Sequence, residues 1–125
     1  MPTRIAPWLS VEDGTKAVDF YQAAFGARVL SRLGGDDGGV QVAQLSIGGA
    51  VFWVQQDIDT APHESRPGSV RMILSVDDPD TVLDKAVAAG AILVAPIHED
   101  FGWRTGRFTD PNGHEWEVSK QIIPD

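Results

Sequence analysis

The 125-residue sequence contains no cysteine, few basic residues and no long run of apolar ones. The absence of cysteine excludes disulfides, thiol nucleophiles and zinc–thiolate sites. The apolar runs are far too short to cross a bilayer, and the first ten residues, MPTRIAPWLS, include no apolar segment of the kind that begins a secreted protein. We therefore expect a cytoplasmic protein with no membrane partner.

The balance of charge is strongly acidic. Ten Lys and Arg residues stand against 18 Asp and Glu residues, so the formal net charge is -8. Such a chain is repelled by the phosphates of nucleic acid, and we expect no nucleic-acid partner. It tolerates a cationic small molecule. The length and an apolar content of 42% favour one globular domain over residues 1–125.

A short phrase occurs twice in the chain, as LSVED at Leu9–Asp13 and as LSVDD at Leu74–Asp78. In each copy, apolar and polar residues alternate as they do in a half-buried strand. Each copy ends in an aspartate that can cap a helix. A helical stripe follows each copy, and each helix is expected to end at a Gly-Ala pair. The stripes are Ala17, Phe20, Tyr21, Ala24 and Phe25 in the first copy, and Val82, Leu83, Ala86 and Val87 in the second; the pairs are Gly26-Ala27 and Gly90-Ala91.

Three strands are predicted after each helix, so the order β-α-β-β-β occurs twice. The first module covers about residues 1–56, a polar linker covers 57–68, and the second module covers about 69–125. A ferredoxin-like sandwich is the main alternative, but it needs only two strands between its helices. The predicted strands are Arg28–Leu33, Val40–Ile47 and Ala50–Gln55, then Ala91–Ile97, Trp103–Thr109 and His114–Ser119.

Two further segments resemble a known family. They are VDFYQAAFGA (Val18–Ala27) and GRFTDPNGHEWEV (Gly106–Val118). With the duplication, they resemble the vicinal oxygen chelate superfamily, which includes glyoxalase I, extradiol dioxygenases, fosfomycin-resistance enzymes and bleomycin-resistance proteins, and within it the PhnB-like branch. The resemblance implies an α+β fold in which two βαβββ modules form a cupped eight-stranded sheet around a shared cavity. It also implies a homodimer, with the modules paired within one chain or exchanged between two.

In metal-dependent members of that superfamily, the first and last strands of each module supply the ligands. The resemblance places these four positions at Ala6, Trp53, Arg71 and Glu117. Alanine has no donor atom, the indole N–H cannot ligate, and arginine is a permanent cation. Only Glu117 remains as a ligand, so we expect no metal and no cofactor. Instead, Arg71 and Glu117 are expected to lie close enough to pair.

The three histidines, His63, His98 and His114, fall in the linker, at a strand end and after a turn, and we interpret them as surface or turn residues. Strand alternation predicts a different set of side chains on the cavity wall. That wall combines aromatic surface with a few polar groups, which suits a small organic ligand. The predicted ligand-binding residues are Trp8, Ser10, Trp53, Arg71, Ile73, Ser75, Glu115 and Glu117.

Two classes of function fit these residues. The favoured one is metal-independent binding of a small organic molecule, cationic or aromatic, as in drug sequestration. The alternative is a lyase, isomerase or dioxygenase of the same superfamily, with a relocated metal site or with Glu117 as acid or base. The sequence identifies neither the ligand nor a catalytic residue.

Overall fold

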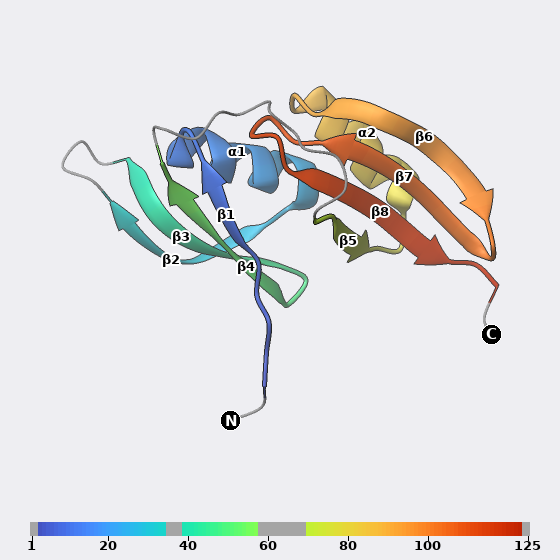
Figure 1. The fold of residues 1–125 in the computed structure, drawn as a ribbon, viewed down its shortest axis with the longest axis horizontal. Helices are drawn as coiled ribbons and strands as arrows, with labels where there is room; N and C mark the ends of the chain where they lie inside the picture. Colours follow the sequence, from blue (N-terminus) through green and yellow to red (C-terminus); the bar gives the residue numbers. More distant parts are fainter. Residues whose placement is uncertain (1–2, 35–38, 58–69, 124–125) are drawn as a thin grey trace.

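The computed structural model describes residues 3–34, 39–57 and 70–123, and its ten elements follow the predicted order (Figure 1). The predicted α+β class and the two βαβββ modules are confirmed. His63 and all of the predicted linker except Asp57 lie outside the described residues. The first module consists of β1 (Trp8–Val11), α1 (Gly14–Phe25), β2 (Arg28–Gly34), β3 (Val40–Ile47) and β4 (Ala50–Gln56). The second consists of β5 (Met72–Ser75), α2 (Pro79–Ala88), β6 (Ile92–Asp100), β7 (Trp103–Thr109) and β8 (Glu115–Gln121).

Each module forms its own four-stranded sheet. The strand orders are β1-β4-β3-β2 and β5-β8-β7-β6. Strand β1 runs parallel to β4, and β5 runs parallel to β8. The other neighbouring strands are antiparallel. Trp8 pairs with Trp53 in the first sheet, and Ile73 pairs with Glu117 in the second. Ile73 follows Trp8 by 65 residues, and Glu117 follows Trp53 by 64. The repeated sequence has the same offsets, 65 residues from Leu9 to Leu74 and 64 from Gly26 to Gly90, so the two modules are structural copies.

The helices begin where the sequence indicates. The side chain of Asp13 accepts a hydrogen bond from the Lys16 amide (3.1 Å), and that of Asp78 accepts one from the Thr81 amide (3.2 Å). Helix α1 ends at Gly26, whose left-handed φ of 65° suits glycine. Helix α2 ends one residue earlier than predicted. Its last residue is Ala88 and its C-cap is Ala89, whereas the sequence indicated Gly90 as the cap.

The core lies between the two helices and the inner faces of both sheets (Figure 1). The predicted stripe on α1 is buried from Ala17 to Ala24, and Tyr21 is fully enclosed. Trp116 of β8 contacts both Tyr21 and Phe25, with ring centroids 5.7 and 4.8 Å apart. Helix α1 therefore packs against its own sheet and against the second one. The stripe on α2 needs one correction: Val87 is 42% exposed, because the buried side of this helix follows Pro79, Leu83 and Ala86.

Two polar contacts also join the modules. The Tyr21 hydroxyl donates to the Asp110 carboxylate (2.5 Å), and the Nε2–H of His114 donates to the Ser10 carbonyl (2.8 Å). His114 follows the predicted turn at residues 110–113, but its ring is partly buried against β1 rather than lying free on the surface. No helix in the described ranges is long and apolar enough to span a membrane.

The strands β2 and β6 form the outer edges of the two sheets, and both are irregular. The register of β6 against β7 shifts twice, between Leu93 and Ala95 and between Ala95 and His98. Pro96, which has no amide hydrogen, lies in the second of these stretches. The register of β2 against β3 also shifts twice along its length.

Candidate functional site

The strands divide their side chains between an inner face that packs on the helices and an open face, as alternation predicts. On β4 and β8 the inner residues Phe52, Val54, Trp116 and Val118 are all buried. The residues between them, including Trp53 and Glu117, are partly exposed. The predicted binding residues therefore lie on the open faces, or just before the strands that form them.

The open face of the first sheet carries a pair of tryptophans. The rings of Trp8 and Trp53 stack, with centroids 5.8 Å apart and planes 25° from parallel. The indole N–H of Trp8 donates to the side-chain oxygen of Gln55 (3.0 Å), which holds the ring in place. Trp8 is 52% exposed, so a broad aromatic surface faces outward from this sheet. Such a surface can stack a planar molecule or hold a cation against its π-face.

The open face of the second sheet carries an ion pair. Arg71 Nε lies 3.3 Å from Glu117 Oε1, as expected from the sequence, and the Glu117 side chain is only 16% exposed. Arg107 pairs in register with Glu117 on the neighbouring strand, and Glu115 precedes it on the same face. The pair makes the centre of this face nearly neutral, while the rest of the guanidinium stays available to a polar group.

The four residues that the resemblance places at the metal positions do not fit a metal ion. Ala6 supplies no donor, Trp53 supplies a ring, and Arg71 places a cation beside the one carboxylate. Within residues 3–34, 39–57 and 70–123, no three His, Cys, Asp or Glu side chains gather in a way that could hold a metal. A single carboxylate that is already paired with a guanidinium is a poor ligand set for any divalent ion.

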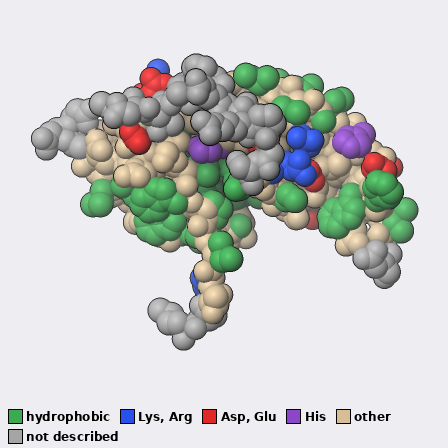
Figure 2. Space-filling model, viewed as in Figure 1, with side chains coloured by type: hydrophobic (Ala, Val, Ile, Leu, Met, Phe, Trp, Pro, Cys, Tyr) green, Lys and Arg blue, Asp and Glu red, His purple; other side chains and the backbone are tan. Residues whose placement is uncertain are grey.

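The structure assembles the predicted residues as two groups, one on each sheet. Trp8, Ser10 and Trp53 share the first open face, whereas Arg71, Ile73 and Ser75 stand with Glu115 and Glu117 on the second. Figure 2 shows a hydrophobic patch over the first sheet, and basic and acidic side chains beside further hydrophobic ones over the second. Among the described residues, no hydrogen bond, ion pair or ring contact joins the Trp8–Trp53 pair to the Arg71–Glu117 pair.

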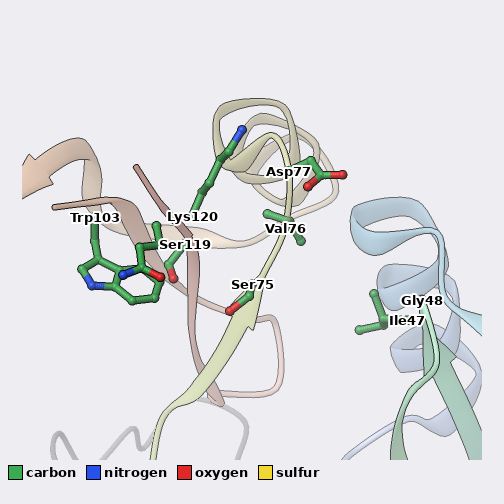
Figure 3. Close-up of a pocket in the computed structure, with 9 residues that line it drawn as sticks. Ile47, Gly48, Ser75, Val76, Asp77, Trp103, Ser119 and Lys120 are labelled. Carbon is green, nitrogen blue, oxygen red and sulfur yellow. The ribbon is translucent and has the colours of Figure 1, made fainter. Parts of the chain in front are cut away.

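A pocket of about 670 Å³ opens between the β3–β4 turn and one end of the second sheet (Figure 3). Ser75 is the only predicted binding residue among those that line it. Trp103 and Ser119 were not predicted, although Ser119 lies two residues beyond Glu117 and therefore on the same face. Extending the alternation by one step would have found it. The lining residues are Ile47, Gly48, Ser75, Val76, Asp77, Trp103, Ser119, Lys120 and Gln121.

Comparison with known proteins agrees with this architecture. Residues 4–118 match the family described as the Glyoxalase/Bleomycin resistance protein/Dioxygenase superfamily. The chain belongs to this superfamily. An uncharacterized protein of Mycobacterium bovis is 32% identical to it over 126 residues, which cover 94% of this chain and 83% of the relative.

Solved structures of similar shape include TioX from Micromonospora sp. ML1, with a TM-score of 0.76 and 27% identity over 97% of this chain and 100% of TioX. A variant of the FosX fosfomycin resistance protein from Listeria monocytogenes, solved with Mn(II) and 1S,2S-dihydroxypropylphosphonic acid, has a TM-score of 0.70. It is 19% identical over 94% of this chain and 92% of FosX, so it shows the fold alone.

Proposed function

We propose that this protein binds a small, planar aromatic molecule without a metal ion, in a cavity built from the open faces of its two modules. The observation that carries the proposal is which residues occupy the four positions that the resemblance assigns to metal ligands. Arg71 forms an ion pair with Glu117, and Trp53 stacks on Trp8, at the places where ligands would be needed. In this proposal, these residues leave too few donors for a metal and supply a stacking surface instead.

The two open faces define the chemistry of the proposed ligand. The Trp8–Trp53 surface accepts a flat ring, and the net charge of -8 favours a ring system that carries positive charge. Arg71 offers free N–H groups to a carbonyl, carboxylate or phenolate on the same molecule. A member of the superfamily that sequesters a drug-like compound would use such a site.

We further propose that the cavity is completed in a homodimer. Trp8 is 52% exposed and Ile73 is 60% exposed, both on open faces that the described residues leave uncovered. A joined patch of exposed apolar surface marks a binding surface, and the stacked rings of Trp8 and Trp53 form such a patch. A partner that brings its second sheet over the first sheet of this chain would enclose the tryptophan pair and the ion pair together. We place the protein in the cytoplasm and in the PhnB-like branch.

The alternative is a lyase, isomerase or dioxygenase of the same superfamily. A relocated metal site would require a new group of donors, and the part of the chain that the structure describes has no cluster of three. Glu117 can still act as an acid or base through Oε2, because the contact with Arg71 is made at Oε1. The lack of a donor cluster in the described residues therefore supports binding over metal-dependent catalysis.

A thermal-shift screen against divalent metals, planar aromatic cations and neutral aromatics tests the proposal, because a ligand raises the unfolding midpoint by mass action. We expect shifts with planar aromatics, and Trp53→Ala should abolish them. Phe101→Ala, which removes an exposed aromatic ring away from both stacked tryptophans, is the matched control and should leave them unchanged.

Elemental analysis and sedimentation complete the test. We expect less than about one-tenth of an equivalent of transition metal per chain, unchanged in Glu117→Gln, and a sedimenting species of twice the 13.5 kDa chain mass. One metal ion per chain that is lost in Glu117→Gln would refute the binding proposal and favour an enzyme. A species of 13.5 kDa at micromolar concentration would refute the dimer.

A further inference from the structure

Three hydroxyl side chains stand in a row across the second sheet. Ser75 of β5 pairs in register with Ser119 of β8, which pairs with Thr105 of β7. This row lies two residues, about 7 Å, along the strands from Glu117, on the same open face. It is therefore adjacent to the Arg71–Glu117 pair at the end of the face that the pocket occupies.

Two of these hydroxyls are buried without a partner. Ser119 is 1% exposed, and neither its Oγ nor the Oγ1 of Thr105 forms a hydrogen bond with any described residue. A buried hydroxyl without a partner destabilises a fold, because it has lost its water without a replacement. Such a group needs an explanation, and one explanation is a bound molecule that completes its hydrogen bonds. Ser75 and Ser119 line the pocket (Figure 3), and Thr105 lies behind Ser119 in the row, so a molecule in the pocket lies against the Ser75–Ser119 end of the row.

The surroundings of the row indicate an uncharged partner. The Lys120 side chain points away from Ser119 (Figure 3), and in register Lys120 pairs with Arg104 on the inner side of the sheet. Arg104 is itself bound to Asp80 and Glu99. Among the described residues, no lysine or arginine forms a hydrogen bond with the hydroxyls of Thr105 and Ser119. The two arginines that share this face, Arg71 and Arg107, lie beside Glu117, so an anion at the row would have to compete with this carboxylate for a counter-charge. Hydroxyls both donate and accept, which matches a group that does the same.

We propose that Ser75, Thr105 and Ser119 form a hydroxyl subsite that binds an uncharged carboxamide-like group of an aromatic ligand, with Trp103 as the apolar wall beside it. This inference rests on the proposed binding function and specifies part of its ligand. Trp103 lines the same pocket and presents its ring on the same face (Figure 3). The hydroxyls of Thr105 and Ser119 then gain the hydrogen bond that the described residues do not supply.

The test compares stability and affinity in the same variants. Thr105→Val and Ser119→Ala remove the unpartnered hydroxyls with little change of shape, so each should raise the unfolding midpoint by a few degrees. Each should also weaken binding of 2-naphthamide, measured by titration calorimetry, by about 5-fold, as expected for one neutral hydrogen bond. On the unmodified protein, 2-naphthamide should bind more tightly than the anionic 2-naphthoate.

Thr109→Val is the matched control, because Thr109 lies on the same strand and face but its hydroxyl is not one of the buried, unpartnered groups of the described residues. It should change neither the midpoint nor the affinity. A lower midpoint in Thr105→Val and Ser119→Ala would overturn the inference, since it would show that the hydroxyls are satisfied within the fold. Unchanged 2-naphthamide affinity in both variants, or no binding to the unmodified protein at millimolar concentration, would also overturn it. Trp53→Ala separates this test from a failure of the proposed function, because Trp53 lies on the first sheet. If Trp53→Ala weakens binding and the hydroxyl variants do not, the binding function stands and only the hydroxyl subsite is wrong.

Discussion

Tyr21 and Asp110 are 89 residues apart in the chain, and the hydroxyl of the first donates to the carboxylate of the second at 2.5 Å. Asp110 is 1% exposed and also accepts from the indole N–H of Trp116 (2.9 Å). Its other oxygen accepts from the backbone amides of Asn112 and His114. One buried carboxylate therefore organises its own turn and binds helix α1 of the other module.

Tyr21→Phe should destabilise the protein by about 2 kcal/mol, because it removes a hydrogen bond to a charged, buried acceptor. Urea unfolding measures the change. A double-mutant cycle with Asp110→Asn should give a coupling free energy well above the scatter of independent sites, roughly 0.5 kcal/mol. Strict additivity of the two changes would contradict the assigned contact.

Tyr21 is the only tyrosine, so its ionisation can be followed by ultraviolet absorbance. Burial, followed by the neighbouring Asp110 charge, raises the pKa of its phenol well above 10.0. The folded state thus favours the neutral phenol, and this contribution to stability is complete below pH 10 and is lost as the pH rises through the folded-state pKa. We expect the tyrosinate signal to appear only together with alkaline unfolding. Titration near pH 10 in the native protein, as in guanidinium, would contradict this.

The sequence determined the two modules well, for a physical reason. Strand alternation has a period of two, so matching Trp53 with Glu117 through the repeat also placed every neighbour on the correct face. The way in which the two modules pack against each other depends on contacts between residues far apart in the chain. Neither the alternation of the strands nor the helix caps predict those contacts. For that reason the Tyr21–Asp110 contact and the role of His114 at Ser10 were not predicted. The pocket at Trp103 was missed because β7 was recognised as a strand but not assigned a face.

Gly14→Ala should destabilise strongly, by about 3 kcal/mol, the upper end for an overpacked site. A methyl group at Gly14 would lie 2.1 Å from the carbonyl oxygen of Val40, and that backbone atom cannot move aside without distorting β3. Gly106→Ala is the comparison, because its methyl would meet the movable ends of the Leu83 and Ile97 side chains at 2.9 Å. Its cost should be about 1 kcal/mol. Equal effects in thermal unfolding would show that α1 can shift away from β3.

Asp13→Ala should cost about 1 kcal/mol, the usual effect of losing a helix N-cap. The side chain satisfies the amide of Lys16, which otherwise has no partner in the first turn of α1. Asp78→Ala should act in the same direction on α2, where the side chain binds both the amide and the hydroxyl of Thr81. Neither change should alter ligand binding. Urea unfolding with unchanged midpoints would contradict the cap assignments.

The irregular outer strands have a consequence for how copies of this chain can meet. A regular edge strand invites a neighbour to extend the sheet by backbone hydrogen bonds, which leads to open-ended association. In β6, Pro96 lacks the amide that such pairing needs, and the two register shifts break the even spacing of the remaining donors. The shifts in β2 act in the same way at the other sheet. Growth of the sheets along β2 and β6 is therefore disfavoured, which leaves the open faces and the edges at β1 and β5 as the surfaces through which two copies can meet.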